Sequence, residues 1–166
     1  QTITIMKNLT KVFVFILGIA VLTGCSDTDS VLHQSLSPEI QKALNAAIED
    51  EFKAQVTYWR ILNDFGSQTK PFSNILNAEV KHADAIANLL NTYSLSVPAN
   101  TFNVTDMPAF STVKDACAAG AIAEVENIEL YDKFLKLDLP SDVRNVFENN
   151  RKASLNNHLP AFNACK

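Results

Sequence analysis

Glu79 and His82 are the residues whose types and spacing most directly suggest chemistry in this chain. A carboxylate and an imidazole three residues apart on a helix project from the same face, so both can bind one metal ion. The same spacing also occurs on solvated, charged helix faces that bind nothing. The rest of the sequence must therefore show whether the pair belongs to a larger site.

The pair belongs to a pattern that occurs twice in the chain. In each copy a glutamate is followed seven residues later by a tyrosine, and a histidine comes 31 residues after the glutamate in the first copy and 34 in the second. The copies consist of Glu51, Tyr58, Glu79 and His82, and of Glu124, Tyr131, Leu155 and His158. Such an internal repeat predicts that each half contributes equivalent positions to a shared centre.

Four helical segments are expected to position these residues. Apolar periodicity and capping signals place them from Ser37-Pro38 to Gly66, from about Pro71 to Tyr93, from about Thr112 to Leu137 and from Pro140 to about Phe162. Residues 94–111 are expected to form a long crossover without a helix of its own. The short links within each pair of helices predict an all-α, antiparallel four-helix bundle with this one crossover. Because Pro160 lacks a backbone donor, we expect the last helix to kink or end close to His158.

Several motifs resemble the ferritin-like superfamily. They are Glu51-x-x-Ala54-x-x-x-Tyr58, Glu79-x-x-His82, Gly120-Ala121-x-x-Glu124 and Asn157-His158-Leu159-x-Ala161-Phe162. Taken in order, they are similar to rubrerythrins and, more specifically, to the uncharacterised ferritin-like family known as domain of unknown function 2202. The resemblance covers roughly residues 37–162. Ferritin-like di-iron sites use one glutamate from each of two helices and a Glu-x-x-His motif from each of the other two.

The resemblance implies a metal site with five of the six expected ligands. Those five are Glu51, Glu79, His82, Glu124 and His158. The sixth position falls on Leu155, which removes a bridging carboxylate, and Ser154 and Asn156 are expected to point elsewhere on the helix. Asn127 stands where rubrerythrins often carry an additional glutamate. We therefore expect an incomplete and asymmetric di-metal site that holds one or two ions, and a sole ion is expected on the side of Glu79 and His82.

Three glutamates inside apolar stripes would be costly to bury as bare anions. They must bind metal, be protonated, or accept hydrogen bonds from partners such as Tyr58 and Tyr131. Oxygen donors with two imidazoles suit iron, manganese or zinc, and the sequence does not choose among them. The alternative is a polar core network without metal. Three functions stay open: a metal-dependent oxidoreductase that reduces dioxygen or peroxide, a metal-binding module without catalysis, and a structural or partner-binding bundle without metal.

Cys117 and Cys165 are expected to form a disulfide. Cys117 lies near the start of the third predicted helix and Cys165 at the end of the fourth, so antiparallel packing brings them to the same end of the bundle. The N-terminal residues, described next, predict export, and disulfides form readily in exported proteins. Metal-ligand or redox-thiol roles are the alternatives, although no Cys-x-x-Cys spacing supports them.

The N-terminal residues predict export and a lipid anchor. Residues 1–24 contain Met6, two lysines and the apolar run 12–22, which has the length of a signal peptide and is short for a permanent membrane helix. Leu22-Thr23-Gly24-Cys25 resembles the bacterial lipobox, in which the cysteine is lipidated. The alternative is a buried apolar helix that ends in a chance cysteine. Residues 25–37 are polar and are expected to tether a folded domain, residues 38–166, to the membrane.

This organisation predicts a lipoprotein anchored in the bacterial cell envelope. Ser26 directly after the cysteine resembles lipoproteins sent to the outer membrane of Gram-negative bacteria. Without Lys7 and Lys11, the chain keeps 12 basic against 18 acidic residues. Nucleic acid is therefore not expected as a partner, because no basic stripe is present to neutralise phosphates. Protein partners and assembly into a homo-oligomer are left open.

Overall fold

The protein is described by a computed structural model that covers residues 35–165. The predicted signal region 1–24, the predicted lipidation site Cys25 and most of the predicted tether lie outside the described residues. Within residues 35–165, every helix is either too short or too polar to cross a lipid bilayer.

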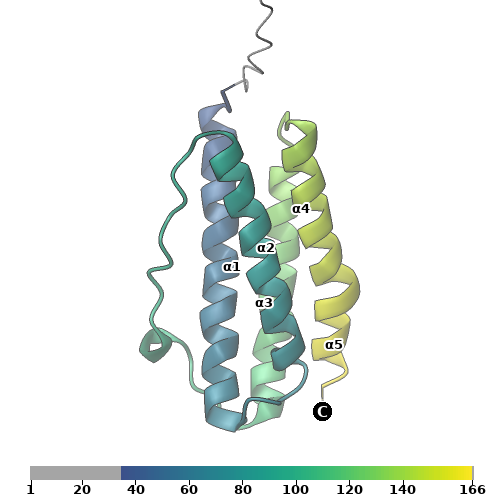
Figure 1. The fold of residues 1–166 in the computed structure, drawn as a ribbon. Coiled ribbons are helices and arrows are strands. Elements are labelled where there is room, and N and C mark those ends of the chain that lie inside the picture. The colour runs from purple at the N-terminus through teal and green to yellow at the C-terminus, as the bar shows by residue number, and fades with distance from the viewer. Residues whose placement is uncertain (1–34, 166) are drawn as a thin grey trace, which may run out of the picture. The chain divides into compact units, whose positions relative to one another are not determined.

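The first two helices form an antiparallel hairpin, as the sequence predicts (Figure 1). Helix α1 spans Pro38–Phe65, and its N-terminus is capped by Ser37, whose Oγ accepts from the Ile40 backbone N–H at 3.4 Å. It ends at Gly66, which has a φ of 109°, a value that a residue with a Cβ rarely adopts. Helix α2 spans Phe72–Thr92.

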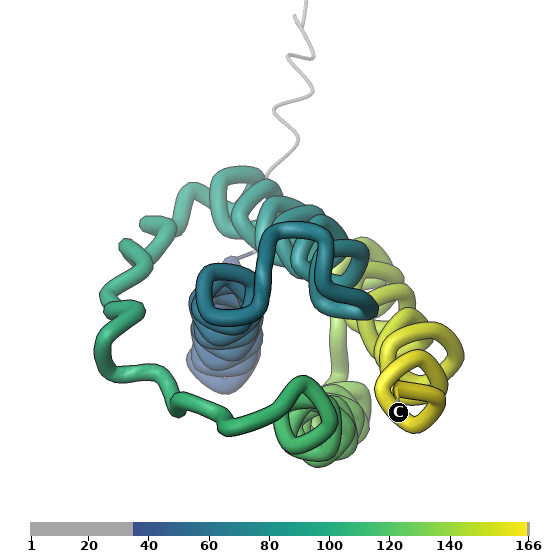
Figure 2. Tube along the Cα trace, turned by 90° about the horizontal axis from the view of Figure 1, so that it is seen from below, coloured from purple at the N-terminus to yellow at the C-terminus, as the bar shows by residue number. Residues whose placement is uncertain are grey.

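A long crossover leads from α2 to the second hairpin. It runs along the outer side of α1, as the view along the bundle in Figure 2 shows. The prediction of a crossover without a helix was wrong in one detail, because Val104–Asp106 form a short 3-10 helix, η1. Arg60 on α1 holds this segment by donating to the carbonyl oxygens of Val104 at 3.3 Å and Met107 at 3.4 Å.

The second hairpin consists of α3 and a fourth helix that is built in three parts. Helix α3 spans Val113–Phe134 and is capped by Thr112, whose Oγ1 accepts from the Asp115 N–H at 3.1 Å. The fourth helix comprises α4 (Ser141–Ala153), a π-helical turn η2 (Ser154–His158) and α5 (Leu159–Asn163). The helix therefore changes its geometry at His158, as Pro160 predicts, but it continues beyond that residue.

The four helices pack as a bundle around a core that a polar layer divides into two apolar clusters. Residues of the first cluster include Leu44, Ile48, Ile86, Leu90, Tyr131 and Phe147. Residues of the second include Tyr58, Ile61, Phe72, Ile75, Cys117 and Phe162. On α1, α2 and α3 a buried glutamate lies between the two clusters, and on the fourth helix His158 does. The predicted disulfide is present, since Cys117 and Cys165 are bonded at the end of the bundle that contains the second cluster.

Candidate metal centre

The polar layer contains all five residues that the sequence predicts as metal ligands. Helix α1 supplies Glu51, α2 supplies Glu79 and His82, α3 supplies Glu124, and η2 supplies His158. The three glutamates and His158 are each at most 4 % exposed, and the His82 side chain is 12 % exposed. Burial of so many ionisable groups needs a compensating interaction, since a bare charge in an apolar core is costly.

Within residues 35–165, two groups of three residues could each hold a metal ion, and Glu79 belongs to both. The first group joins Glu51, Glu79 and His82. Its His82 Nδ1 lies 2.8 Å from Glu79 Oε2 and 3.4 Å from Glu51 Oε2. One oxygen of the Glu79 carboxylate therefore faces this half of the layer.

The second group joins Glu79, Glu124 and His158. Its His158 Nδ1 lies 3.2 Å from Glu79 Oε1 and 3.4 Å from Glu124 Oε2. The other oxygen of Glu79 therefore faces this half. The two imidazole rings stack with their centres 5.4 Å apart. The arrangement is close to symmetric about Glu79, and the predicted preference of a sole ion for one side stays a prediction.

The remaining oxygens of the two outer glutamates accept hydrogen bonds from tyrosines. Tyr131 on α3 donates to Glu51 Oε1 at 2.6 Å, and Tyr58 on α1 donates to Glu124 Oε1 at 2.9 Å. Each bond joins the two helices, and Asn150 donates in turn to the Tyr131 hydroxyl at 3.0 Å. Burial raises the pKa of both tyrosines, so they remain donors. These bonds fix the carboxylates and leave one oxygen of each directed at a histidine.

Three buried polar atoms in this layer make no hydrogen bond, although each lies 3.2 to 3.4 Å from an oppositely charged group. They are Glu51 Oε2, Glu124 Oε2 and His158 Nδ1. Unpaired polar atoms are rare in protein cores, because each one costs free energy. Glu51 Oε2 belongs to the first ligand group and the other two atoms to the second, so a cation in each group would satisfy all three. The donor set fits a metal ion on this criterion.

The ionisation of the layer reflects the same geometry. Burial works against a charge on His82, but its contacts with Glu51 and Glu79 outweigh burial and raise the pKa of His82 to about 10. Burial likewise disfavours the charged form of Glu79, yet the close approach of the His158 and His82 imidazoles outweighs it and lowers the pKa of Glu79. Burial raises the pKa of Glu51. Without metal, the positive charge of the protonated imidazoles therefore balances the negative charge of the carboxylates.

The assignment of Leu155 to the sixth, inward-facing position was wrong. Leu155 is 39 % exposed, whereas Ser154 is only 2 % exposed and faces the core. The cause is the π-helical turn, in which the Leu159 N–H bonds to the Ser154 carbonyl five residues earlier, so that the inner position precedes His158 by four residues and not by three. The expectation that Ser154 points elsewhere was therefore also wrong.

Ser154 belongs to a polar chain that the sequence did not reveal. Its hydroxyl donates to Asn127 Oδ1 at 2.8 Å, and the Asn127 amide donates to Asp50 Oδ2 at 2.8 Å. The chain connects η2, α3 and α1 beside the ligand layer. The neutral side chains of Ser154 and Asn127 thus lie where ferritin-like proteins, by the resemblance, would have glutamates. A sequence signal existed in Pro160, which disturbs the hydrogen bonds of the preceding turn, but it does not specify the direction of the change.

Comparison with known proteins gives one distant homologue. The uncharacterized protein MJ0754 of Methanocaldococcus jannaschii is 29 % identical over 147 residues, which cover 80 % of this chain and 78 % of that protein. No family model matches the chain. No solved structure matches it either. The ferritin-like resemblance therefore stays a prediction.

Proposed function

We propose that this four-helix bundle binds divalent metal ions of the iron, manganese or zinc type, one in each of the two ligand groups of the polar layer. The convergence of Glu51 Oε2, Glu124 Oε2 and His158 Nδ1 is the observation that carries the proposal, because these buried atoms face other predicted ligand atoms and make no hydrogen bond. Three carboxylates and two imidazoles form a donor set that suits these metals.

The arrangement also supports a ferritin-like assignment. Four helices form two antiparallel hairpins, a long crossover joins them, and the ligands come from equivalent positions in each half (Figure 1). Glu79 presents one oxygen to each half, which is the placement required of a carboxylate that bridges two ions. In ferritin-like proteins the corresponding site lies in the same place within the bundle.

Metal analysis of the purified full chain tests the proposal. We expect the wild-type protein to bind about two ions, and His82→Ala and His158→Ala to lose one each, because each substitution removes the imidazole of one group. His33→Ala is the matched control, since His33 is the remaining histidine of the chain and belongs to the predicted tether. Equal metal content in all four proteins would contradict the proposal.

A redox-active metal such as iron would supply electron transfer to dioxygen or peroxide. Consumption of either oxidant by the iron-loaded protein, and its loss in His82→Ala, would establish an oxidoreductase. A protein that binds metal tightly but consumes neither would be a non-catalytic metal-binding module. Absence of metal after reconstitution, with unchanged stability of His82→Ala, would favour the structural or partner-binding alternative.

We further propose that the bundle is held in the cell envelope by a lipid on Cys25. The supporting observations are the basic start, the apolar run 12–22 and the lipobox-like residues that precede the cysteine. Labelling with a radioactive fatty acid should mark the wild-type protein, and Cys25→Ala should be unlabelled and released from membranes. Labelling that persists in Cys25→Ala would reject this attachment site.

A further inference from the structure

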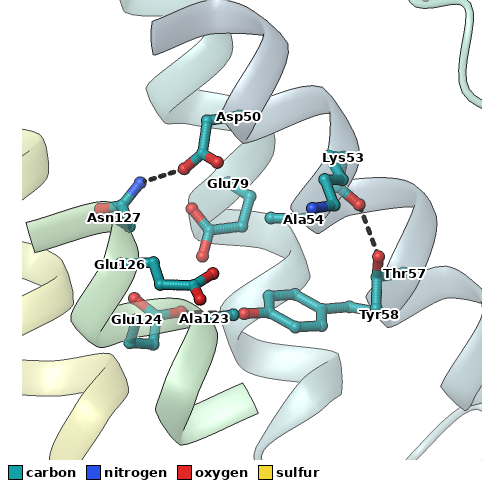
Figure 3. A pocket seen from close by; sticks show the side chains of 10 residues that line it. All are labelled: Asp50, Lys53, Ala54, Thr57, Tyr58, Glu79, Ala123, Glu124, Glu126 and Asn127. Carbon is teal, nitrogen blue, oxygen red and sulfur yellow. Dashed lines mark hydrogen bonds between the residues drawn. The ribbon is translucent and has the colours of Figure 1, made fainter. Parts of the chain in front are cut away.

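A pocket between α1 and α3 leads from the surface to the ligand layer (Figure 3). Its inner wall includes Glu79 and Glu124, both buried, and its outer wall includes Glu126 and Lys53, both exposed. The pocket has a cavity volume of about 60 Å³. On this measure one water needs about 10 to 15 Å³, so an ion with a few waters fits inside.

Carboxylates are present along the whole depth of this pocket. Glu126 lies at the exposed end, Asp50 is partly buried, and Glu79 and Glu124 close the inner end. Lys53 is the single basic side chain among the lining residues. The walls therefore carry net negative charge, and a cleft of one sign within apolar walls concentrates ions of the opposite sign.

The inner end of the pocket is prepared for a cation. Glu124 is 2 % exposed, and its Oε2 has no hydrogen-bond partner. Its other oxygen is held by Tyr58, which also lines the pocket. Beside it, Asn127 is fixed by its bond to Asp50 and keeps the wall polar (Figure 3). An ion that crosses the pocket would exchange water for carboxylate oxygens step by step.

We propose that this pocket is the access route by which divalent cations reach the buried centre, with Glu126 and Asp50 as the steering carboxylates. The proposal rests on the metal site proposed above and adds the path and its charge. The first ligand atoms that an entering ion meets are then those of Glu124 and Glu79, on the side of His158.

Rates of cobalt(II) uptake and loss by the full chain, measured by stopped-flow absorption, test the route. Glu126→Lys reverses a charge at the mouth, and Glu129→Lys makes the same change three residues further along α3 at an exposed position outside the pocket. We expect uptake by Glu126→Lys to be about tenfold slower at low ionic strength, and the difference to shrink as salt is added. Uptake by Glu129→Lys should be slowed by a clearly smaller factor, because Glu129 does not line the pocket.

A steric pair of variants separates a route from a binding effect. Ala123→Leu narrows the exposed end of the pocket, and Ala118→Leu adds the same bulk at an exposed position of α3 outside it. A narrower route must slow uptake and loss by the same factor, so Kd stays unchanged in Ala123→Leu. Ala118→Leu should change neither rate.

The outcomes distinguish the route from the site. Equal uptake rates in Glu126→Lys and Glu129→Lys, together with wild-type rates in Ala123→Leu, would overturn the access route while equilibrium binding of cobalt still upheld the metal site. Failure of the wild-type protein to bind cobalt at equilibrium would overturn the metal site and the route with it. Both steric variants lie at exposed helix positions, so their folding can be verified by circular dichroism.

Discussion

Replacement of Glu79 by glutamine should abolish binding of both ions. Glu79 Oε2 lies 2.8 Å from His82 Nδ1 and Glu79 Oε1 lies 3.2 Å from His158 Nδ1, so each ligand group depends on this one carboxylate. Glutamine keeps the shape of the side chain and removes its charge. In Glu51→Gln, by contrast, only the group that contains His82 loses an anionic ligand.

The size of the effect follows from mass action. An ion at a concentration of one hundred times its Kd stabilises the folded state by about 2.7 kcal/mol, and two independent ions by about 5.4 kcal/mol. For a domain of this size, about 1 kcal/mol corresponds to roughly 4 °C in Tm. Saturating metal should therefore raise Tm by about 20 °C in the wild type, by about 10 °C in Glu51→Gln and by almost nothing in Glu79→Gln.

Differential scanning calorimetry with and without metal measures these shifts. The exposed residue Glu49 on α1 provides the control, because Glu49→Gln makes the same chemical change outside the polar layer. It should keep the full metal-dependent shift. The reasoning would be refuted if Glu79→Gln kept half or more of the wild-type shift, or if Glu51→Gln lost all of it.

Further predictions concern protons, packing and the disulfide. The pKa of His82 is raised to about 10 and that of His158 to about 9, so a metal ion must displace their protons. The affinity for metal should therefore rise with pH up to about 9 to 10. The metal-free protein should lose stability as the pH rises through the same range, because the favourable charged form of the imidazoles is lost. Calorimetry in buffers of different ionisation enthalpy should detect the released protons, and their absence would contradict this ionisation state. A Cβ at Gly120 would lie 2.7 Å from the Phe162 ring, so Gly120→Ala should destabilise the fold by about 1 to 2 kcal/mol in urea, since the cost of overpacking exceeds the gain in helix propensity; an unchanged midpoint would show that the ring can move. The disulfide spans 48 residues, and its reduction should lower the free energy of unfolding by about 4 kcal/mol, which equal urea midpoints before and after reduction would refute.

Most of the fold could be predicted because its signals are local. Ser37 and Thr112 cap their helices as capping residues do in isolated peptides, and Gly66 stops α1 because of its backbone freedom. The repeat identified positions that meet, since equivalent residues of two similar hairpins lie at the centre of a bundle, and the resemblance assigned these positions as ligands. The glutamates and histidines therefore meet in the structure as the sequence predicts.

The rest depends on geometry that residue spacing does not contain. The assignment of Leu155 assumed a regular α-helix, in which residues three apart share a face, and the π-helical turn breaks that assumption. The chain from Ser154 through Asn127 to Asp50 joins residues of three helices, whose rotations about their own axes must be known before such contacts can be foreseen. The pocket between α1 and α3 depends on the same rotations.

The π-helical turn also has a consequence for protein engineering. Such a turn contains one residue more than an α-helical turn, and the exposed Leu155 lies within it. The fourth helix therefore differs from a helix with a Glu-x-x-His motif by one residue of register and by one side chain. Deletion of Leu155 combined with Ser154→Glu would bring a glutamate three residues before His158 and remove both differences. Two sequence changes would then give both hairpins the same Glu-x-x-His spacing.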